Sequence, residues 1–137
     1  GNGEPALVLT LPNQATVSDD GLLNASEIAK LKMDAELVIL SACDTAAGGA
    51  DSDALGLSGL ARAFFSAGTR SLLVSNWPVI SEAAKDITTN MFQKIEPDRP
   101  TDYATALQRA VLQVMANAKS DLERHPVYWA PFVVIGE

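Results

Sequence analysis

Three short runs of apolar residues constrain the fold of this chain more than any other feature. They are Leu37–Ala42, Ser71–Ser75 and Pro131–Gly136. Their apolar side chains occupy successive positions rather than alternate ones, which is typical of strands covered on both faces in a parallel sheet. A fourth run, Ala6–Leu11, stops at Pro12-Asn13 and predicts another strand. Together the four runs predict a sheet that forms the centre of the fold.

Helical patterns separate these runs. Asn24 and Glu27 have capping-box spacing at the start of a short helix predicted from Ala25 to Leu31. Apolar residues at helical spacing predict three more helices: one that contains Leu57 to Phe65 and stops at Gly68, one over Ser81–Ile95, and one over Tyr103–Ala118. Strands that alternate with helices predict an α/β fold, a mainly parallel sheet flanked by helices on both faces. Since the first strand has no helix before it, we expect residues 1–137 to be a single partial domain, N-terminally truncated.

Length, composition and charge exclude several functional classes. A chain of 137 residues fits one compact domain, and a hydrophobic content of 47% is enough for a core. The 10 basic and 17 acidic residues give a net charge of −7. Nucleic-acid binding is therefore not expected, because it relies on clustered Lys and Arg. No apolar run approaches the roughly 20 residues that span a bilayer, and no signal-peptide pattern opens the chain, so no membrane role is expected.

Cys43 and His125 are the only cysteine and the only histidine. An intrachain disulfide is therefore impossible, and a reducing, cytoplasmic location is expected. A zinc site with three or four Cys and His ligands cannot be built from this chain alone. The sequence contains no GxGxxG, GK[ST] or GxSxG motif. We expect no metal and no cofactor, and a small-molecule-binding α/β domain unrelated to proteolysis lacks the motif that it would need.

The candidate site residues follow the ends of predicted strands. In open α/β sheets, ligands gather beyond the carboxyl ends of the strands, because loops and helix N-termini converge there. Cys43 follows one such end, and Ser75, Asn76 and Trp77 form another. A nucleophilic thiol needs a position of this kind, although an isolated cysteine is more often a small buried side chain. His125 precedes a segment predicted as a loop, where a histidine more often packs or forms hydrogen bonds than acts as a general base.

Six segments also form an ordered pattern over nearly the whole chain. They are Pro5–Leu9, Asp20–Ile28, Val38–Ala46, Gly59–Gly68, Ser75–Val79 and His125–Phe132. Each alone is weak, but in this order they resemble the C-terminal part of a CHAT domain, a caspase-like domain usually found beside tetratricopeptide repeats in bacterial proteins.

The resemblance implies a three-layer caspase-hemoglobinase-like fold whose peptidase members, cysteine peptidases of clan CD, use a Cys-His dyad. Cys43 matches the nucleophile of the family. The family's histidine belongs to a His-Gly pair that would precede Pro5, and the glycine of that pair is thought to supply half of the oxyanion hole. His125 matches a different segment, near the family's C-terminus. The implied function is therefore the C-terminal portion of a cysteine endopeptidase that is nearly inert by itself, since loss of a general base costs about 10²–10⁴-fold.

The resemblance also implies substrate-binding roles. Ser75, Asn76 and Trp77 resemble the strand end that pairs with the substrate backbone in caspase-like enzymes. Asp44 could select a basic residue on the amino side of the cleaved bond, or could be a turn residue that bonds the local backbone. Both interpretations of Asp44 stay open.

A second functional class is a non-catalytic scaffold or adaptor that binds other proteins. As the resemblance implies, a His-Gly pair after an apolar strand roughly 40 to 60 residues upstream of Cys43 would favour the peptidase, and its absence would favour the adaptor. The expected partner is a polypeptide, either a substrate or a partner protein, with tetratricopeptide repeats in the parent chain. Two copies could also pair through an exposed sheet edge.

Overall fold

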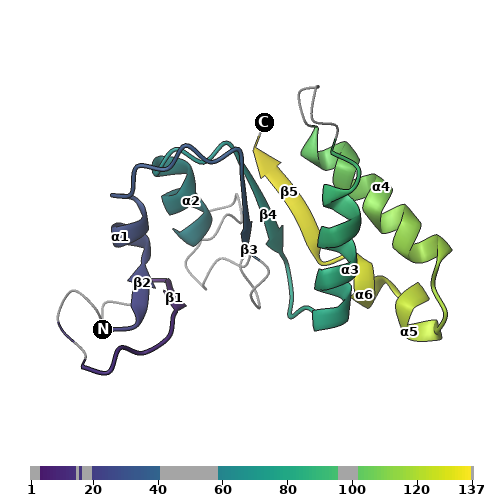
Figure 1. Ribbon diagram of the computed structural model, residues 1–137, viewed down its shortest axis with the longest axis horizontal. Helices are drawn as coiled ribbons and strands as arrows, with labels where there is room; N and C mark the ends of the chain where they lie inside the picture. Colours follow the sequence, from purple (N-terminus) through teal and green to yellow (C-terminus); the bar gives the residue numbers. More distant parts are fainter. Residues whose placement is uncertain (1–3, 15, 17–19, 41–58, 96–101, 137) are drawn as a thin grey trace.

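The computed structural model describes residues 4–14, 16, 20–40, 59–95 and 102–136. The elements in chain order are β1 (Ala6–Val8), β2 (Leu22–Asn24), α1 (Ala25–Ile28), β3 (Leu37–Leu40), α2 (Gly59–Ser66), β4 (Ser71–Ser75), α3 (Ser81–Phe92), α4 (Tyr103–Ala116), α5 (Asp121–Arg124), α6 (Pro126–Trp129) and β5 (Phe132–Gly136) (Figure 1). The predicted α/β class is confirmed. The elements β2, α5 and α6 were not expected from the sequence.

A mixed sheet of β3, β4 and β5, in that order, lies at the centre of the fold. β3 and β4 are parallel, with Leu40 opposite Val74, whereas β4 and β5 are antiparallel, with Ser75 opposite Phe132. The prediction of a mainly parallel sheet is therefore not confirmed. The reason is that α3 and α4 pack against each other as a helical hairpin, so the chain re-enters the sheet at the end where it left β4 (Figure 1).

The first strand does not join this sheet, contrary to the prediction. β1 pairs with β2 in a separate two-stranded antiparallel sheet, with Leu7 opposite Leu23. The hairpin is extended by a hydrogen bond of 2.8 Å from the Leu9 amide to the Gly21 carbonyl. Because β2 follows β1 closely in the chain, this pairing costs less loop-closure entropy than pairing with the distant β3.

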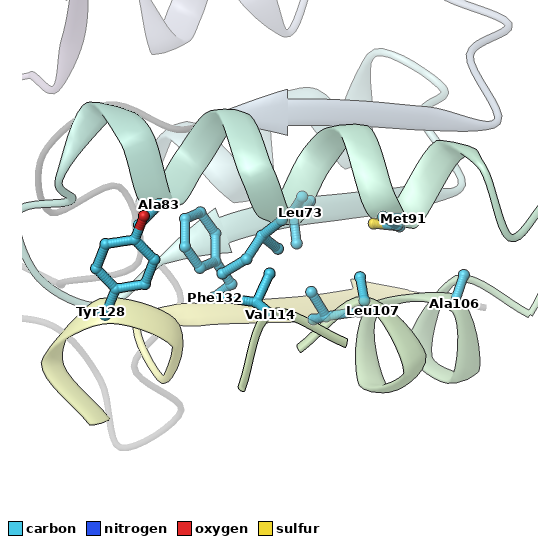
Figure 2. Close-up of a cluster of buried hydrophobic side chains, with 10 residues drawn as sticks. Leu73, Ala83, Met91, Ala106, Leu107, Val114, Tyr128 and Phe132 are labelled. Atoms are coloured by element: carbon cyan, nitrogen blue, oxygen red, sulfur yellow. The ribbon is translucent and has the colours of Figure 1, made fainter. Parts of the chain in front are cut away.

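Helices cover both faces of the central sheet. One core contains Leu73 and Phe132 with buried side chains of α3, α4 and α6, among them Ile87 and Met91 of α3 (Figure 2). The other core contains Leu72 and Val74 with buried side chains of α1 and α2. Successive residues of β4 thus point to opposite faces, which explains why the strand is apolar on consecutive positions.

Local signals place the ends of the helices. The capping box at Asn24 and Glu27 is present, and the Glu27 carboxylate accepts a bond of 2.9 Å from the Asn24 amide. α2 ends at Ser66, and Gly68 follows with a φ of 103°. A residue with a side chain would rarely adopt this backbone angle. A Cβ atom at Gly68 would also overlap the carbonyl oxygen of Met33. The helices in the described ranges are too short or too polar to cross a membrane.

Candidate active site

The carboxyl ends of β3 and β4 lie side by side at the same end of the sheet, because the two strands are parallel and in register. β3 ends at Leu40, opposite Val74, and β4 continues one residue further to Ser75. Cys43 and Asp44, the predicted nucleophile and its neighbour, lie outside the described residues. The structure therefore shows the strand end that leads to Cys43, and the roles of both residues stay predictions.

The end of β4 is fixed by the chain that enters β5. Ser75 is fully buried and lies opposite Phe132. The backbone amide of the next residue, Asn76, donates a hydrogen bond of 2.9 Å to the carbonyl of Pro131. The side chain of Asn76 is exposed. Of these two residues, Asn76 is therefore the one that offers a surface to a ligand, while Ser75 lies in the interior.

Trp77 connects the β4 end to α6. Its half-buried indole donates a hydrogen bond to the carbonyl of Val127 at 3.5 Å. The segment that contains Val127 was predicted as a loop, and this is wrong, because Pro126–Trp129 form the short helix α6. Proline suits the first turn of a helix, where its missing amide is not needed, and His125 caps that turn.

His125 acts as the cap through its Nδ1 atom, which accepts a hydrogen bond of 3.2 Å from the amide of Val127. In a neutral imidazole with Nδ1 as the acceptor, the proton is on Nε2, which is then a donor. For Nε2 to accept a proton from a thiol, the ring would have to change tautomer and release the cap. The structure thus agrees with the expectation that His125 forms hydrogen bonds rather than serving as the base.

Tyr128 links α6 to α3 in a way that the sequence did not indicate. The side chain is 5% exposed and belongs to the buried cluster drawn in Figure 2. Its hydroxyl donates to the carboxylate of Asp86 at 3.3 Å. Burial, followed by the negative charge of Asp86, raises the pKa of Tyr128 above its usual value. The two residues are 42 positions apart, so no local spacing could reveal the pair.

A polar cavity of about 290 Å³ adjoins the Tyr128–Asp86 pair. Asn90 of α3 and Glu123 of α5 line it as well. Metal binding was not expected, and in the described ranges no three His, Cys, Asp or Glu side chains are grouped so that they could hold a metal ion.

Comparison with known proteins gives two kinds of match. A family model described as "CHAT domain" matches residues 2–137. The chain is 30% identical over 142 residues to the mouse protein "Tetratricopeptide repeat protein 28", and 28% identical over 142 residues to the human protein of that name. Each alignment covers 93% of this chain but only 6% and 5% of the mouse and human proteins, respectively. No solved structure matches the chain. Both of these relatives are mammalian, so the bacterial origin stays a prediction.

Proposed function

The chain belongs to the CHAT-domain family, a caspase-like family, and from this premise we propose that it is the C-terminal portion of a cysteine endopeptidase domain with Cys43 as the nucleophile. In the proposed reaction, the Cys43 thiolate attacks the carbonyl carbon of a peptide bond. A histidine supplied from outside these 137 residues takes the thiol proton and then gives it to the leaving amine. The acyl-enzyme is hydrolysed by water. The described residues include the strand ends that border the proposed site.

The observation that carries this proposal is that the carboxyl ends of β3 and β4 lie side by side at the same end of the sheet. In the sequence, Cys43 follows three residues after Leu40, the last residue of β3. Asn76 and Trp77 follow the end of the neighbouring strand. A ligand held beyond the carboxyl ends of these strands would therefore lie near both the strand end that precedes the predicted nucleophile in the sequence and the strand end that precedes Asn76 and Trp77.

The position of β3 supports a histidine from elsewhere. In the described part of the chain, β3 is an edge strand of the central sheet. A further strand that runs parallel to β3 would bring its own carboxyl end next to that of β3, which is where the histidine of a Cys-His dyad is needed. The same strand would widen the central sheet. His125, already occupied as a helix cap, does not supply this group.

Substrate recognition is assigned to both strand ends. The exposed Asn76 and the half-buried Trp77 are proposed to border an extended peptide, and Ser75 to hold the strand end from the interior. Asp44 is proposed to favour a basic residue at the cleavage site, since its charge would lie beside the nucleophile.

A second candidate is a scaffold that binds proteins without cleaving them. It is favoured by the capping role of His125, the sole histidine of the chain, and by the name of the mammalian relatives, which are tetratricopeptide repeat proteins. For either candidate we propose a tetratricopeptide-containing parent protein, a polypeptide partner and a cytoplasmic location. Pairing of two copies through the edge of β3 is a further expectation that sedimentation would test.

The rate at which Cys43 reacts with a peptide electrophile separates the candidates. A peptidyl acyloxymethyl ketone with Arg at its reactive end should modify the 137-residue chain as slowly as a free thiol with a pKa of about 8.5. It should modify a protein that also contains the proposed upstream histidine about 10²–10⁴-fold faster, because the dyad is then complete. The rate of reaction with iodoacetamide, a small electrophile, corrects for differences in the accessibility of the thiol. Cys43→Ser is the negative control, because it removes the only thiol of the chain. Equal rates in the two proteins would reject the peptidase and leave the scaffold.

A further inference from the structure

Val127 of α6 connects His125 to Trp77 through its own backbone. Its amide donates a hydrogen bond of 3.2 Å to Nδ1 of His125, and its carbonyl accepts the bond of 3.5 Å from the indole of Trp77. The amide has no helical acceptor, because it lies in the first turn of α6. The carbonyl has no helical donor, since the residue four positions further on is Pro131, which lacks an N–H group. Both backbone groups of Val127 are therefore available to side chains.

Burial alone does not fix this link. Trp77 is half-buried, and Val127 is 39% exposed. α6 has only four residues, too few to be stable as an isolated helix, so its hydrogen bonds to the surroundings determine its position. Tyr128 anchors α6 to Asp86 of α3. The bond to His125 acts on Val127 itself, the residue that holds the indole of Trp77.

The cap limits how Val127 can turn. Its amide and its carbonyl belong to two planar peptide units that share one Cα atom. While His125 holds the amide, rotation about this atom is restricted, and the carbonyl keeps its direction toward Trp77. Without the cap, the amide can turn to water, and the carbonyl is free to turn as well.

We propose that His125 is a positioning residue for substrate binding, which orients the indole of Trp77 through the backbone of Val127. The inference rests on the proposed function, in which Trp77 borders the substrate peptide. His125 itself touches no substrate and transfers no proton. Loss of the cap should therefore weaken peptide binding, and the effect should appear in KM more than in kcat.

Three substitutions of His125 separate this role from that of a general base. In histidine Nδ1 is bonded to Cγ, and in asparagine the amide oxygen is bonded to Cγ as well, so His125→Asn keeps an acceptor at the capping position. His125→Gln places its oxygen one bond further out, and His125→Ala removes the acceptor. A cap predicts that only the asparagine variant behaves as the parent does, whereas a general base predicts that all three variants lose activity.

Heteronuclear NMR spectra of the indole N–H groups report on the link directly, because Trp77 and Trp129 are the two tryptophans of the chain. Trp129→Phe assigns the two resonances. His125→Ala and His125→Gln should shift the Trp77 resonance and speed its exchange with water about 2–10-fold, as expected for the loss of one hydrogen bond. His125→Asn should leave both unchanged. Ser120→Ala is the matched control, because Ser120 caps the neighbouring helix α5 through the Glu123 amide at 3.3 Å and its loss should not affect Trp77.

Kinetics on a protein that also contains the proposed upstream histidine test the consequence for binding. With a peptide substrate, His125→Ala should raise KM about 2–10-fold and change kcat less. His125→Asn should leave KM unchanged, and Trp77→Ala should raise it at least as much as His125→Ala does. Because His125 acts through Trp77, the double variant should be no worse than Trp77→Ala alone.

Three outcomes would overturn the proposal. One is a Trp77 resonance that is the same in His125→Ala as in the parent. Another is a double variant whose KM exceeds that of Trp77→Ala by the full effect of His125→Ala. The third is a loss of kcat in His125→Asn with an unchanged Trp77 resonance, since this would make His125 a base. If the parent does not cleave the peptide, the proposed function fails, and the dissociation constant of the intact peptide replaces KM in the same comparison.

Discussion

Replacement of Gly68 by alanine tests how the central sheet is aligned. Gly68 has a φ of 103°, and a Cβ atom there would overlap the backbone carbonyl of Met33. Two hydrogen bonds flank this contact: the Met33 amide donates to Ala67 at 2.7 Å, and the Arg70 amide donates to Ala35 at 3.0 Å. These bonds hold the turn before β4 against the segment before β3. Alanine at Gly68 would force the two segments apart.

The cost follows from these contacts. The backbone strain of a non-glycine residue in this conformation is about 1–3 kcal/mol. Weakening the two flanking hydrogen bonds adds roughly 1 kcal/mol each. We therefore expect Gly68→Ala to lower the free energy of unfolding by about 3–5 kcal/mol, a large share of the roughly 5–15 kcal/mol typical of a domain.

Urea denaturation followed by circular dichroism measures this loss. Ser66→Ala is the control, because Ser66 is exposed at the end of α2 and its replacement should cost little. Gly68→Asn separates the two causes, since asparagine tolerates a positive φ but still has a Cβ atom. It should be nearly as unstable as the alanine variant. A loss below about 1 kcal/mol for Gly68→Ala, or wild-type stability for Gly68→Asn, would refute the reasoning.

Three further predictions concern single side chains. Tyr128→Phe should cost about 0.5–1.5 kcal/mol at neutral pH through the lost bond to Asp86. Since burial and the Asp86 carboxylate raise the pKa of Tyr128 above 10.0, the wild type, but not the variant, should lose stability as the pH rises past about 10, as thermal melts would show. Hydrogen bonds from Thr105 lower the pKa of Asp102 below 3.8, so the stability they contribute should fall as the pH drops through that range. Asp102→Asn keeps the cap of α4 and should remove this acid dependence in melts at low pH; an unchanged slope would count against the cap. In a longer, active protein, Asp44→Asn should reduce the preference for Arg over Leu substrates, and an unchanged ratio of kcat/KM would reject that role for Asp44.

The apolar runs predicted the central strands well because a strand that is buried on both faces has apolar side chains at successive positions. Every residue of β4 is buried, and the predicted and observed bounds of this strand agree. The direction of β5 could not be read in the same way. An antiparallel and a parallel strand have equally apolar sequences, and the direction depends on whether one helix or a helical hairpin precedes the strand.

Short elements were the hardest to predict. β2 has three residues, Leu22–Asn24, which is too few for an alternating pattern to be recognised. α6 begins with Pro126, which was interpreted as a loop signal although proline is also frequent in a first helical turn.

The candidate site was predictable only in part. The apolar runs predicted the strands that end next to Cys43 and Asn76. Those strand ends were candidate sites because ligands gather where parallel strands end. The role of His125 as a cap depends on the backbone amide of Val127, and the partner of Tyr128 lies 42 residues away. Contacts of this kind arise from tertiary packing, which leaves no periodic signal in the sequence.

The chain that leaves β4 and the chain that enters β5 are joined where they meet, through the bonds of Asn76 to Pro131 and of Trp77 to Val127. The two ends of the segment that contains α3 to α6 are therefore held together by hydrogen bonds. A protease that cut this segment once would leave both fragments bound to each other, because β4 and β5 stay paired. Damage to the helical side would thus not, by itself, release the strand end that borders the candidate site.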